Sequence, residues 1–477
     1  MHSKALRMFN AALLLGSALA LPQPVAYSYD QNAPAELVYS NANDRRDTQH
    51  RASNQADPDL TPDCKHDQFG RATYCQGGFY GQQGVGVWQD PNDPTHVTVN
   101  GPLGQAGHSD FGYFYKPEGG GTEFPNYGLS RNKDPYALPK TLPLKAANGK
   151  TIDIPTIGYG TWASGDTSWA KDSTLTALKE GYRHIDGAWY YGVTKPVGEA
   201  IRESGVPREE IFWTSKAWMH FFSPSNIELA LDKILADAGL SHVDLFLAHW
   251  PAAQQPISRA SLEKASVRPG ATSEEKGQAT DSTGKTLVDW EHTSAPIAAK
   301  AGKQGSFVPT WKAMQDVVRK GKARAIGVSN FSQTDLEDLL NSPDIDHSIP
   351  ISCNQIEVHP WLPQNELIAF HNKHGIITTC FSPFAGQKSD GKTLLNDPDV
   401  VALAKKNGMD VGQLLQSWAV QRGTIPLGKS ATPSRIKSNI RIGRLSAEDF
   451  ETLNGMGLPN GEGRTVNPSE AFGVELF

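Results

Sequence analysis

The residues of this chain that could carry chemistry are an acid, a tyrosine, a lysine and a histidine. Asp186 and Tyr191 lie in the stretch HIDGAWYYG, and Lys216 and His249 each follow an apolar run. A free tyrosine has a pKa of about 10 and is a poor acid at neutral pH, but a neighbouring ammonium favours the phenolate and lowers that pKa. A carboxylate would hold the lysine in place, and an imidazole would orient a carbonyl oxygen. These four residue types predict a proton donor aimed at an oxygen that becomes an alkoxide.

Protonation of an oxygen is half of such a reaction, because another group must attack the carbon. A hydride is the natural reactant, and it must come from a cofactor. The expected chemistry needs no metal.

Strand-like and helix-like segments alternate from about residue 141, and these elements must position the four side chains. A hairpin with Asn148-Gly149 as its turn comes first, and eight strand–helix pairs follow. Eight such pairs predict an α/β fold, a (β/α)8 TIM barrel with an N-terminal β-hairpin. The alternative is an open doubly wound sheet, which would need a glycine fingerprint after its first strand, and GYGTW does not supply one. The expected strands are 154–161, 182–188, 210–218, 242–250, 323–331, 351–359, 376–384 and 423–430.

Polar residues gather at the ends of these strands. Active sites of parallel barrels form at the carboxyl ends of the strands, so the side chains there are expected to meet. One of them alone would be read as a polar group satisfied within the core, but the whole set at one end predicts a site. Its members are Asp186, Tyr191, Lys216, His249, Ser329, Asn330, Gln355, Phe381 and Ser382.

The chain before the barrel has a different composition. Residues 1–20 have a basic start, an apolar run and a small-x-small ending, which predict a signal peptide. Residues 21–138 are rich in Gly, Pro, Asn and aromatics without a helical period, so an irregular extension with short strands is expected there. A disulfide between Cys64 and Cys75 is plausible in it, whereas Cys353 and Cys380 are expected to be small buried residues.

The net charge and the lengths of the apolar runs exclude some classes of protein. The net charge of -6 argues against a nucleic-acid partner, which usually needs a basic face. No run of 18 apolar residues is present, so no membrane span is expected. A long polar segment at 252–308 interrupts the strand–helix pattern after the fourth strand, where it could cover the site.

From about residue 140 to 477 the chain resembles the aldo-keto reductase family. The matching motifs are GYRHIDGAWYYG, VGEAI, TSKAW, DLFLAHWP, GKARAIGVSNF, NQIEVHPWLPQNELIAF, FSPF and KSATPSRIKSN, with NPSEAFGVELF similar to the C-terminal loop of that family. The resemblance implies that Tyr191 is the proton donor, that Asp186 and Lys216 tune it, and that His249 orients the substrate.

The resemblance also implies NADPH as the cofactor. Ser329, Asn330 and Gln355 would hold the nicotinamide carboxamide, and Phe381 would stack on the ring in place of the usual tyrosine. Lys429, Ser430 and Arg435 match the group that binds the adenosine 2′-phosphate, where a guanidinium at a helix start favours an anion. The residues expected at the cofactor are Ser329, Asn330, Gln355, Phe381, Ser382, Lys429, Ser430, Arg435 and Asn439; those expected around the substrate are Trp162, Trp218 and Trp250.

The chain departs from the family pattern at several positions. Met219 and Phe221 stand where polar residues are common, so a more apolar pocket rim is expected. Gly428 stands where proline is usual, and Ser438 replaces an acid expected near the adenine. None of these changes removes a catalytic group.

The sequence therefore predicts NADPH-dependent reduction of an aldehyde or ketone, with the reverse oxidation possible. The alternative is an exported, non-catalytic binding protein that retains the barrel. A monomer is expected, located in the secretory pathway or outside the cell, or in the cytoplasm if the start of the chain is misassigned. Asn330-Phe331-Ser332 forms an N-glycosylation sequon, so a glycan there would block the expected cofactor site.

Overall fold

The chain divides into two compact units, and the described residues of one of them lie in strands. The computed structural model describes residues 63–66, 72–76, 86–90, 93–101, 104–107, 114–115, 137–162, 165–388 and 391–477. The proposed signal peptide lies outside the described residues, as does most of the extension. The strands of the first unit are β1 (Asp63–His66), β2 (Ala72–Gln76), β3 (Gly86–Asp90), β4 (Asp93–Gly101), β5 (Gly104–Gly107) and β6 (Phe114–Tyr115).

The register of the first two strands bears on the expected disulfide. β1 and β2 pair in antiparallel fashion, and Cys64 lies opposite Cys75. Opposed residues of antiparallel strands have Cα atoms about 4.5–5.5 Å apart, a spacing that a disulfide can bridge. The pairing of these two cysteines stays a prediction. The other two, Cys353 and Cys380, are free and buried, which confirms the expectation for them.

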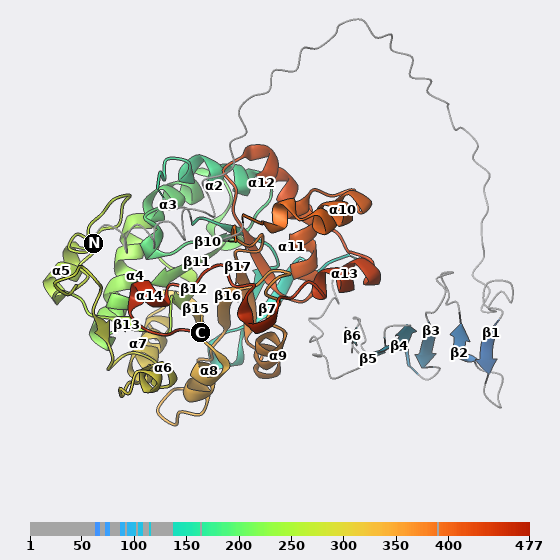
Figure 1. Ribbon diagram of the computed structural model, residues 1–477, viewed down its shortest axis with the longest axis horizontal. Coiled ribbons are helices and arrows are strands. Elements are labelled where there is room, and N and C mark those ends of the chain that lie inside the picture. Colours follow the sequence, from blue (N-terminus) through green and yellow to red (C-terminus); the bar gives the residue numbers. More distant parts are fainter. Residues whose placement is uncertain are drawn as a thin grey trace, which may run out of the picture. The chain divides into compact units, whose positions relative to one another are not determined.

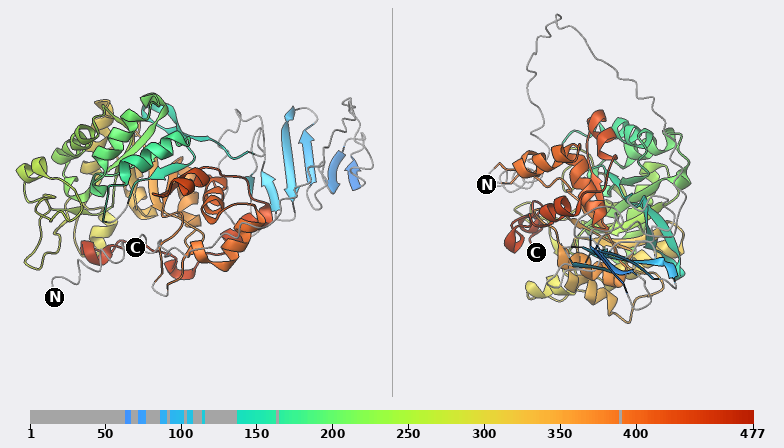
Figure 2. Two further views of the ribbon diagram at one scale, coloured as in Figure 1. Left: turned by 90° about the horizontal axis from the view of Figure 1, so that it is seen from above. Right: turned by 90° about the vertical axis from the view of Figure 1, so that its right-hand side faces the viewer.

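The second unit is a closed barrel of eight parallel strands, and this confirms the predicted fold (Figures 1 and 2). The strands follow the order β10-β11-β12-β15-β16-β17-β18-β9 around the barrel. They are β9 (Gly158–Gly160), β10 (His184–Asp186), β11 (Phe212–Ala217), β12 (Val243–Ala248), β15 (Ala323–Ser329), β16 (Cys353–Glu357), β17 (Ile377–Phe381) and β18 (Ile425–Gly428).

Helices cover the outside of the barrel because each presents an apolar face to the strands. In α4 (Pro224–Ala238) the buried residues Ile227, Leu231, Ile234 and Ala238 recur every three or four positions, the spacing of one helical face. The other helices that follow barrel strands are α2 (Ala170–Lys179), α3 (Thr194–Glu203), α7 (Val308–Arg319), α8 (Gln333–Leu340), α9 (Asn365–His374), α10 (Pro398–Lys406), α11 (Val411–Gln421), α12 (Pro433–Asn439), α13 (Ala447–Asn454) and α14 (Ser469–Phe472).

The predicted hairpin is present as β7 (Thr141–Lys145) and β8 (Thr151–Pro155), and it packs on the barrel interior. Leu142, Leu144 and Ile154 join one apolar cluster with Leu245 and Leu247 of β12. The turn uses Asn148 and Gly149 at φ 59° and 70°, a left-handed conformation that these two residue types tolerate best. The hairpin fills the end of the barrel opposite the carboxyl ends of the strands, which leaves the other end for chemistry.

The segment 252–308 contains regular structure as well as loops. Its elements are β13 (Ala253–Gln254), which pairs with β14 (Val288–Asp289), and the helices α5 (Arg259–Lys264) and α6 (Ala295–Lys300). Ser294 Oγ donates to Asp335 Oδ1 at 2.5 Å, which ties the segment to α8. A Cβ on Gly192 would lie 3.2 Å from the carbonyl oxygen of Val267, so the segment lies against the loop that carries Tyr191.

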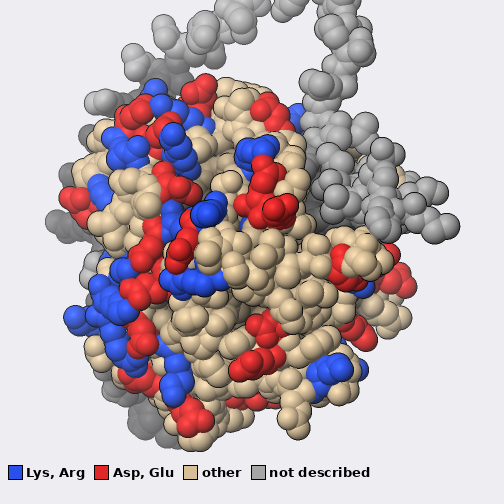
Figure 3. All heavy atoms as spheres, turned by 90° about the vertical axis from the view of Figure 1, so that its left-hand side faces the viewer, with Lys and Arg blue, Asp and Glu red and all other residues tan. Residues whose placement is uncertain are grey.

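Charges of both signs are interspersed on the face of the molecule in Figure 3. Among the surface ion pairs, Lys322 Nζ contacts Glu228 at 2.8 Å and Asp232 at 2.5 Å. Exposed pairs of this kind contribute only about 0–1 kcal/mol each. Of the helices that the structure describes, none is long and apolar enough to cross a membrane.

Three histidines in the barrel unit are buried in the neutral form, which predicts loss of stability in mild acid. Burial lowers the pKa of His184 to about 4 and the pKa values of His220 and His371 to about 3. Below about pH 6.5 the unfolded chain binds these protons and the folded chain does not, so stability is complete above that pH and falls toward pH 4 at about 1.4 kcal/mol per pH unit per histidine.

Guanidinium unfolding at pH 7.5 and pH 5.0 measures this loss, because most carboxylates remain ionised over that range. The three groups together are expected to lower the unfolding free energy by about 5 kcal/mol, and His249, a further buried histidine whose pKa burial lowers, adds to this loss. Equal midpoints at the two pH values would contradict the assignment of neutral buried imidazoles.

Candidate active site

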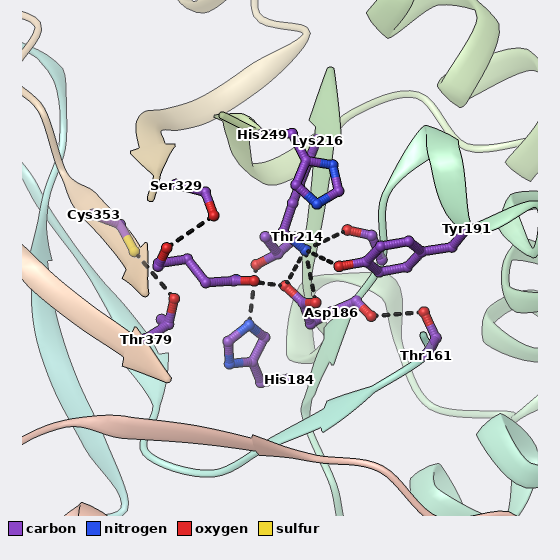
Figure 4. Close-up of polar contacts among 12 residues, drawn as sticks. Thr161, His184, Asp186, Tyr191, Thr214, Lys216, His249, Ser329, Cys353 and Thr379 are labelled. Carbon is purple, nitrogen blue, oxygen red and sulfur yellow. Dashed lines mark hydrogen bonds and ion pairs between the residues drawn. The ribbon is translucent and has the colours of Figure 1, made fainter. Parts of the chain in front are cut away.

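Four side chains from three neighbouring strand ends meet at the carboxyl end of the barrel (Figure 4). Lys216 Nζ, on β11, donates to Asp186 Oδ1 and Oδ2 at 2.9 and 2.8 Å and to the carbonyl oxygen of Gly187 at 2.9 Å. It also lies 3.2 Å from the hydroxyl oxygen of Tyr191, which belongs to a 3-10 turn after β10. His249 follows β12, and its ring lies edge-on to Tyr191 with centroids 5.6 Å apart. The sequence-predicted group is thus brought together.

Lys216 and Asp186 form a buried ion pair. Their side chains are 0% and 4% exposed. Burial lowers the pKa of Lys216, and the Asp186 carboxylate opposes that shift. The ammonium therefore depends on this carboxylate to remain charged inside the barrel.

The expectation that the ammonium lowers the pKa of Tyr191 was wrong for this arrangement. Burial, reinforced by the negative charge of Asp186, raises the pKa of Tyr191 well above its ordinary value. The reason is that the positive charge of Lys216 is already balanced by Asp186, so the phenol gains little from it. Tyr191 accordingly holds its proton at neutral pH, as a proton donor must before it reacts.

His249 is neutral in this setting. Burial, followed by the charge of Lys216, lowers the pKa of His249 well below its ordinary value. Its Nδ1 is buried and has no hydrogen-bond partner among the described residues. A neutral imidazole at this position can hydrogen-bond a ligand oxygen without adding a second positive charge.

Gln355 connects two sides of the barrel, which its sequence pattern did not reveal. Its Nε2 donates to Asp186 Oδ1 at 2.9 Å, and its backbone oxygen accepts from Ser329 Oγ at 2.8 Å. β16, which carries Gln355, is four strands away from β10 in either direction around the barrel. Because a carboxylate only accepts, the amide nitrogen must face Asp186, and this leaves Oε1 to accept from another donor.

Asn330 offers a place for an amide ligand. Its Nδ2 donates to the backbone oxygen of His249 at 3.0 Å and to Ser329 Oγ at 3.1 Å. Its Oδ1 is buried without a partner among the described residues, a costly arrangement unless a donor arrives. A nicotinamide carboxamide has such an N–H donor, so these residues fit the predicted cofactor.

Two expected cofactor residues have left-handed backbones. Asn330 has φ 64° and Ser382 has φ 49°, and positive φ at residues other than glycine stores strain that often marks functional sites. Ser382 follows Phe381, which is half-buried at the end of β17. The stacking role of Phe381 stays a prediction.

The residues expected at the adenosine phosphate lie at and after the end of β18. Lys429 Nζ lies 4.4 Å from the ring centroid of Trp169, and Arg435 is exposed on α12. Neither cation forms an ion pair with any residue that the structure describes, so the positive charges of both are available to bind a phosphate group. Ser430 accepts a hydrogen bond from the backbone N–H of Thr432.

Asn439 has a different setting from these phosphate residues. Its side chain is buried, and a Cβ on Gly412 would lie 2.4 Å from its Oδ1. The backbone oxygen of Asn439 accepts from Gln416 Nε2 at 2.7 Å. These contacts give Asn439 a packing role at the end of α12, and its contact with a cofactor stays a prediction.

Aromatic rings line the space beside His249. Trp218 lies edge-on to His249 with centroids 5.0 Å apart, and its Nε1 is buried without a partner among the described residues. Trp250 and Trp218 both contact Phe472, at 5.5 and 5.8 Å between centroids. Phe472 on the C-terminal segment was not predicted as a site residue, although the resemblance of NPSEAFGVELF to a family loop was a signal for it.

The ring of Tyr190 belongs to the same group of aromatic side chains and was also not predicted. Tyr190 stacks on Trp218 with centroids 3.7 Å apart and planes 12° apart, and it stacks more loosely on Trp162 at 6.5 Å. Its position next to Tyr191 was the available signal. The expected apolar rim from Met219 and Phe221 was wrong, because both are fully buried in the main core.

The sequence model described as the Aldo/keto reductase family matches residues 156–457. Glycerol 2-dehydrogenase (NADP(+)) from Saccharomyces cerevisiae is 42% identical over 317 residues, 66% of this chain and 91% of that protein. Aldehyde reductase YPR1 from the same yeast is 38% identical over 69% of this chain and 97% of its own length. Aldo-keto reductase family 1 member A1 from Xenopus tropicalis is 34% identical over 66% of this chain and 94% of its own length. With the barrel and the buried Asp186–Lys216–Tyr191 group, these matches place the chain in the aldo/keto reductase family.

Proposed function

We propose that this protein reduces aldehydes or ketones reversibly with NADPH. The observation that carries the proposal is the contact of Tyr191 with Lys216, whose charge is held by both oxygens of Asp186. The names of the yeast relatives, an NADP-dependent glycerol dehydrogenase and an aldehyde reductase, support the same chemistry. The substrate is a small carbonyl compound, and the chain acts as a monomer.

The residues of the chain have distinct tasks in this reaction. Tyr191 donates its proton to the carbonyl oxygen, and Lys216, 3.2 Å away, stabilises the phenolate that remains. His249 accepts no proton at neutral pH and orients the carbonyl oxygen. The reduced nicotinamide, when bound, supplies the hydride to the carbonyl carbon. Ser329, Asn330 and Gln355 would hold its carboxamide.

The direct test is NADPH consumption by the purified full-length chain with a panel of aldehydes and ketones, together with NADP⁺ reduction by glycerol. Reduction of at least one carbonyl compound, with alcohol formed in equal amount, is expected. Cofactor binding without turnover of any compound would instead favour a binding protein. A fluorescence titration with NADPH distinguishes that outcome from a misfolded preparation.

Replacement of Arg435 by alanine is expected to weaken NADPH binding about 10- to 100-fold, because a hydrogen bond to a charged group contributes about 1.5–3 kcal/mol. NADH lacks the 2′-phosphate, so its affinity should change little. Titration of the variant with both cofactors measures the difference. Lys437→Ala is the matched control, since Lys437 is an exposed cation on the same helix. Equal loss for NADPH and NADH would place the phosphate elsewhere.

We also propose that the chain enters the secretory pathway, on the sequence of residues 1–20 alone. The sequon residue Asn330 is then expected to remain unmodified. It is buried, with φ 64°, and Ser332 Oγ donates to Asp335 Oδ2 at 2.6 Å at the start of α8. Intact mass of protein secreted from a eukaryotic host, before and after deglycosylation, measures this. A glycan on Asn330 with loss of NADPH binding would count against an exported enzyme and favour a cytoplasmic one.

A further inference from the structure

Lys276 lies in the segment 252–308, and its ammonium group forms no ion pair with any acid that the structure describes. The side chain is half-buried, and its Nζ lies 5.3 Å from the centroid of the Tyr190 ring. The adjacent Glu275 is engaged elsewhere, because it accepts from Arg268 and from the backbone N–H of Thr272. Burial lowers the pKa of Lys276, and the negative charge of Glu275 opposes that shift without forming an ion pair with the ammonium. A half-buried cation without a paired acid is unusual, since the loss of water around it is only partly offset.

The backbone around Lys276 is held in place, so the direction of its side chain is constrained. The N–H of Lys276 donates to the carbonyl oxygen of Thr272 at 3.1 Å, and the N–H of Gly277 donates to that of Glu274 at 2.8 Å. Directly after this turn, Gln278 Nε2 donates to Gln254 Oε1 at 2.8 Å, and both of these side chains are buried. The turn is therefore fastened to the inner strand of the segment.

The ring under Lys276 leads into the candidate active site. Tyr190 precedes the proposed proton donor in the sequence and stacks on Trp218 at 3.7 Å between centroids. Trp218 in turn lies edge-on to His249 at 5.0 Å. Two aromatic rings thus separate the ammonium of Lys276 from the imidazole that would orient the carbonyl.

We propose that Lys276 binds the carboxylate of a carbonyl substrate, so that the enzyme prefers aldehydes or ketones with a negative charge remote from the reacting group. The flat rings of Tyr190 and Trp218 would contact the apolar part of such a molecule, and the ammonium would pair with its far end. This inference rests on the proposed function and names the substrate class of the same site.

The test compares charged substrates with their uncharged esters. 4-Carboxybenzaldehyde and the longer 4′-formylbiphenyl-4-carboxylate are each compared with their methyl esters, which carry the same carbonyl group. The wild-type enzyme should show a lower KM for at least one acid than for its ester. Lys276→Met, which keeps the apolar stem of the side chain, should raise that KM about tenfold with kcat little changed and leave the ester unaffected.

Two further variants separate a charge effect from a structural one. Lys276→Arg should restore the preference for the acid, and added salt should reduce the preference in wild-type enzyme. Lys264→Met is the matched control, because Lys264 is an exposed lysine of the same segment. Equal changes for acid and ester in Lys276→Met, or no change in either, would overturn the inference.

A binding measurement tests the carboxylate site independently of the proposed reductase activity. Quenching of tryptophan fluorescence by 4-carboxybenzaldehyde reports its affinity, since Trp218 lies within the stack. If no compound is reduced but Lys276→Met still weakens binding of the acid about tenfold, the proposed reduction is wrong and the carboxylate site stands. If the affinity is unchanged in Lys276→Met, the carboxylate site is wrong whatever the activity.

Discussion

Replacement of Tyr191 by phenylalanine is expected to lower turnover about 10²- to 10⁴-fold, the usual contribution of a general acid, while NADPH binding remains nearly intact. The phenol is the group that can reach a carbonyl oxygen next to His249 and that contacts the Lys216 ammonium at 3.2 Å. Phenylalanine keeps the ring and removes the hydroxyl group that carries the proton. Steady-state reduction of the best carbonyl substrate, together with a fluorescence titration of NADPH, gives both quantities.

Tyr190→Phe is the control for this change. Tyr190 is the adjacent tyrosine, and its ring stacks on Trp218, so phenylalanine preserves the stack and removes a hydroxyl that the mechanism does not use. Turnover of this variant should remain within several-fold of wild type. A Tyr191→Phe enzyme with more than half of the wild-type turnover would show that the proton comes from another group.

The second large effect is on stability. Asp186→Asn keeps the shape of the side chain but leaves the fully buried Lys216 ammonium without a counter-charge. Loss of one partner of a buried ion pair typically costs about 3–5 kcal/mol, which is a large part of the stability of a domain. Guanidinium unfolding at pH 7.5 should therefore show a clear decrease in the midpoint. Activity should fall as well, because the position of Lys216 beside Tyr191 depends on both carboxylate oxygens.

The double variant Asp186→Asn/Lys216→Met distinguishes the charge from the packing. Methionine removes the ammonium and retains an apolar chain of similar length, so the unpaired charge disappears. Most of the lost stability should return in the double variant, although activity should not. If the single and double variants are equally unstable, the loss comes from the hydrogen bond that Gln355 donates to Asp186, and the ion pair contributes little.

The barrel and the grouping of the site could be predicted from the sequence because both depend on local patterns. Eight apolar runs alternate with helical periods, and a residue at the carboxyl end of a parallel strand is placed at one end of the barrel by connectivity alone. Asp186, Lys216, His249 and Asn330 were found in this way. The hairpin was found because Asn148-Gly149 marks a turn by its backbone preference.

What the sequence could not give depends on the surroundings of a side chain in three dimensions. The pKa of Tyr191 rises because burial and Asp186 outweigh the nearby ammonium, and neither burial nor charge balance is visible in a motif. Met219 and Phe221 were assigned to the pocket rim from their neighbours in the chain, but their 3-10 turn directs them into the core. The bond between Gln355 and Asp186 joins residues 169 positions apart.

The hydrogen bond between Gln355 and Asp186 also links completion of the active site to closure of the barrel during folding. β10 and β16 lie on opposite sides of the ring, so we expect the hydrogen bond from Gln355 to Asp186 to form after the intervening strands on at least one side have paired. Contacts so distant in the sequence close slowly, because the entropy of a long loop must be lost first. During refolding, recovery of catalytic activity should thus follow recovery of helical circular dichroism as a separate, slower phase that reports closure of the ring.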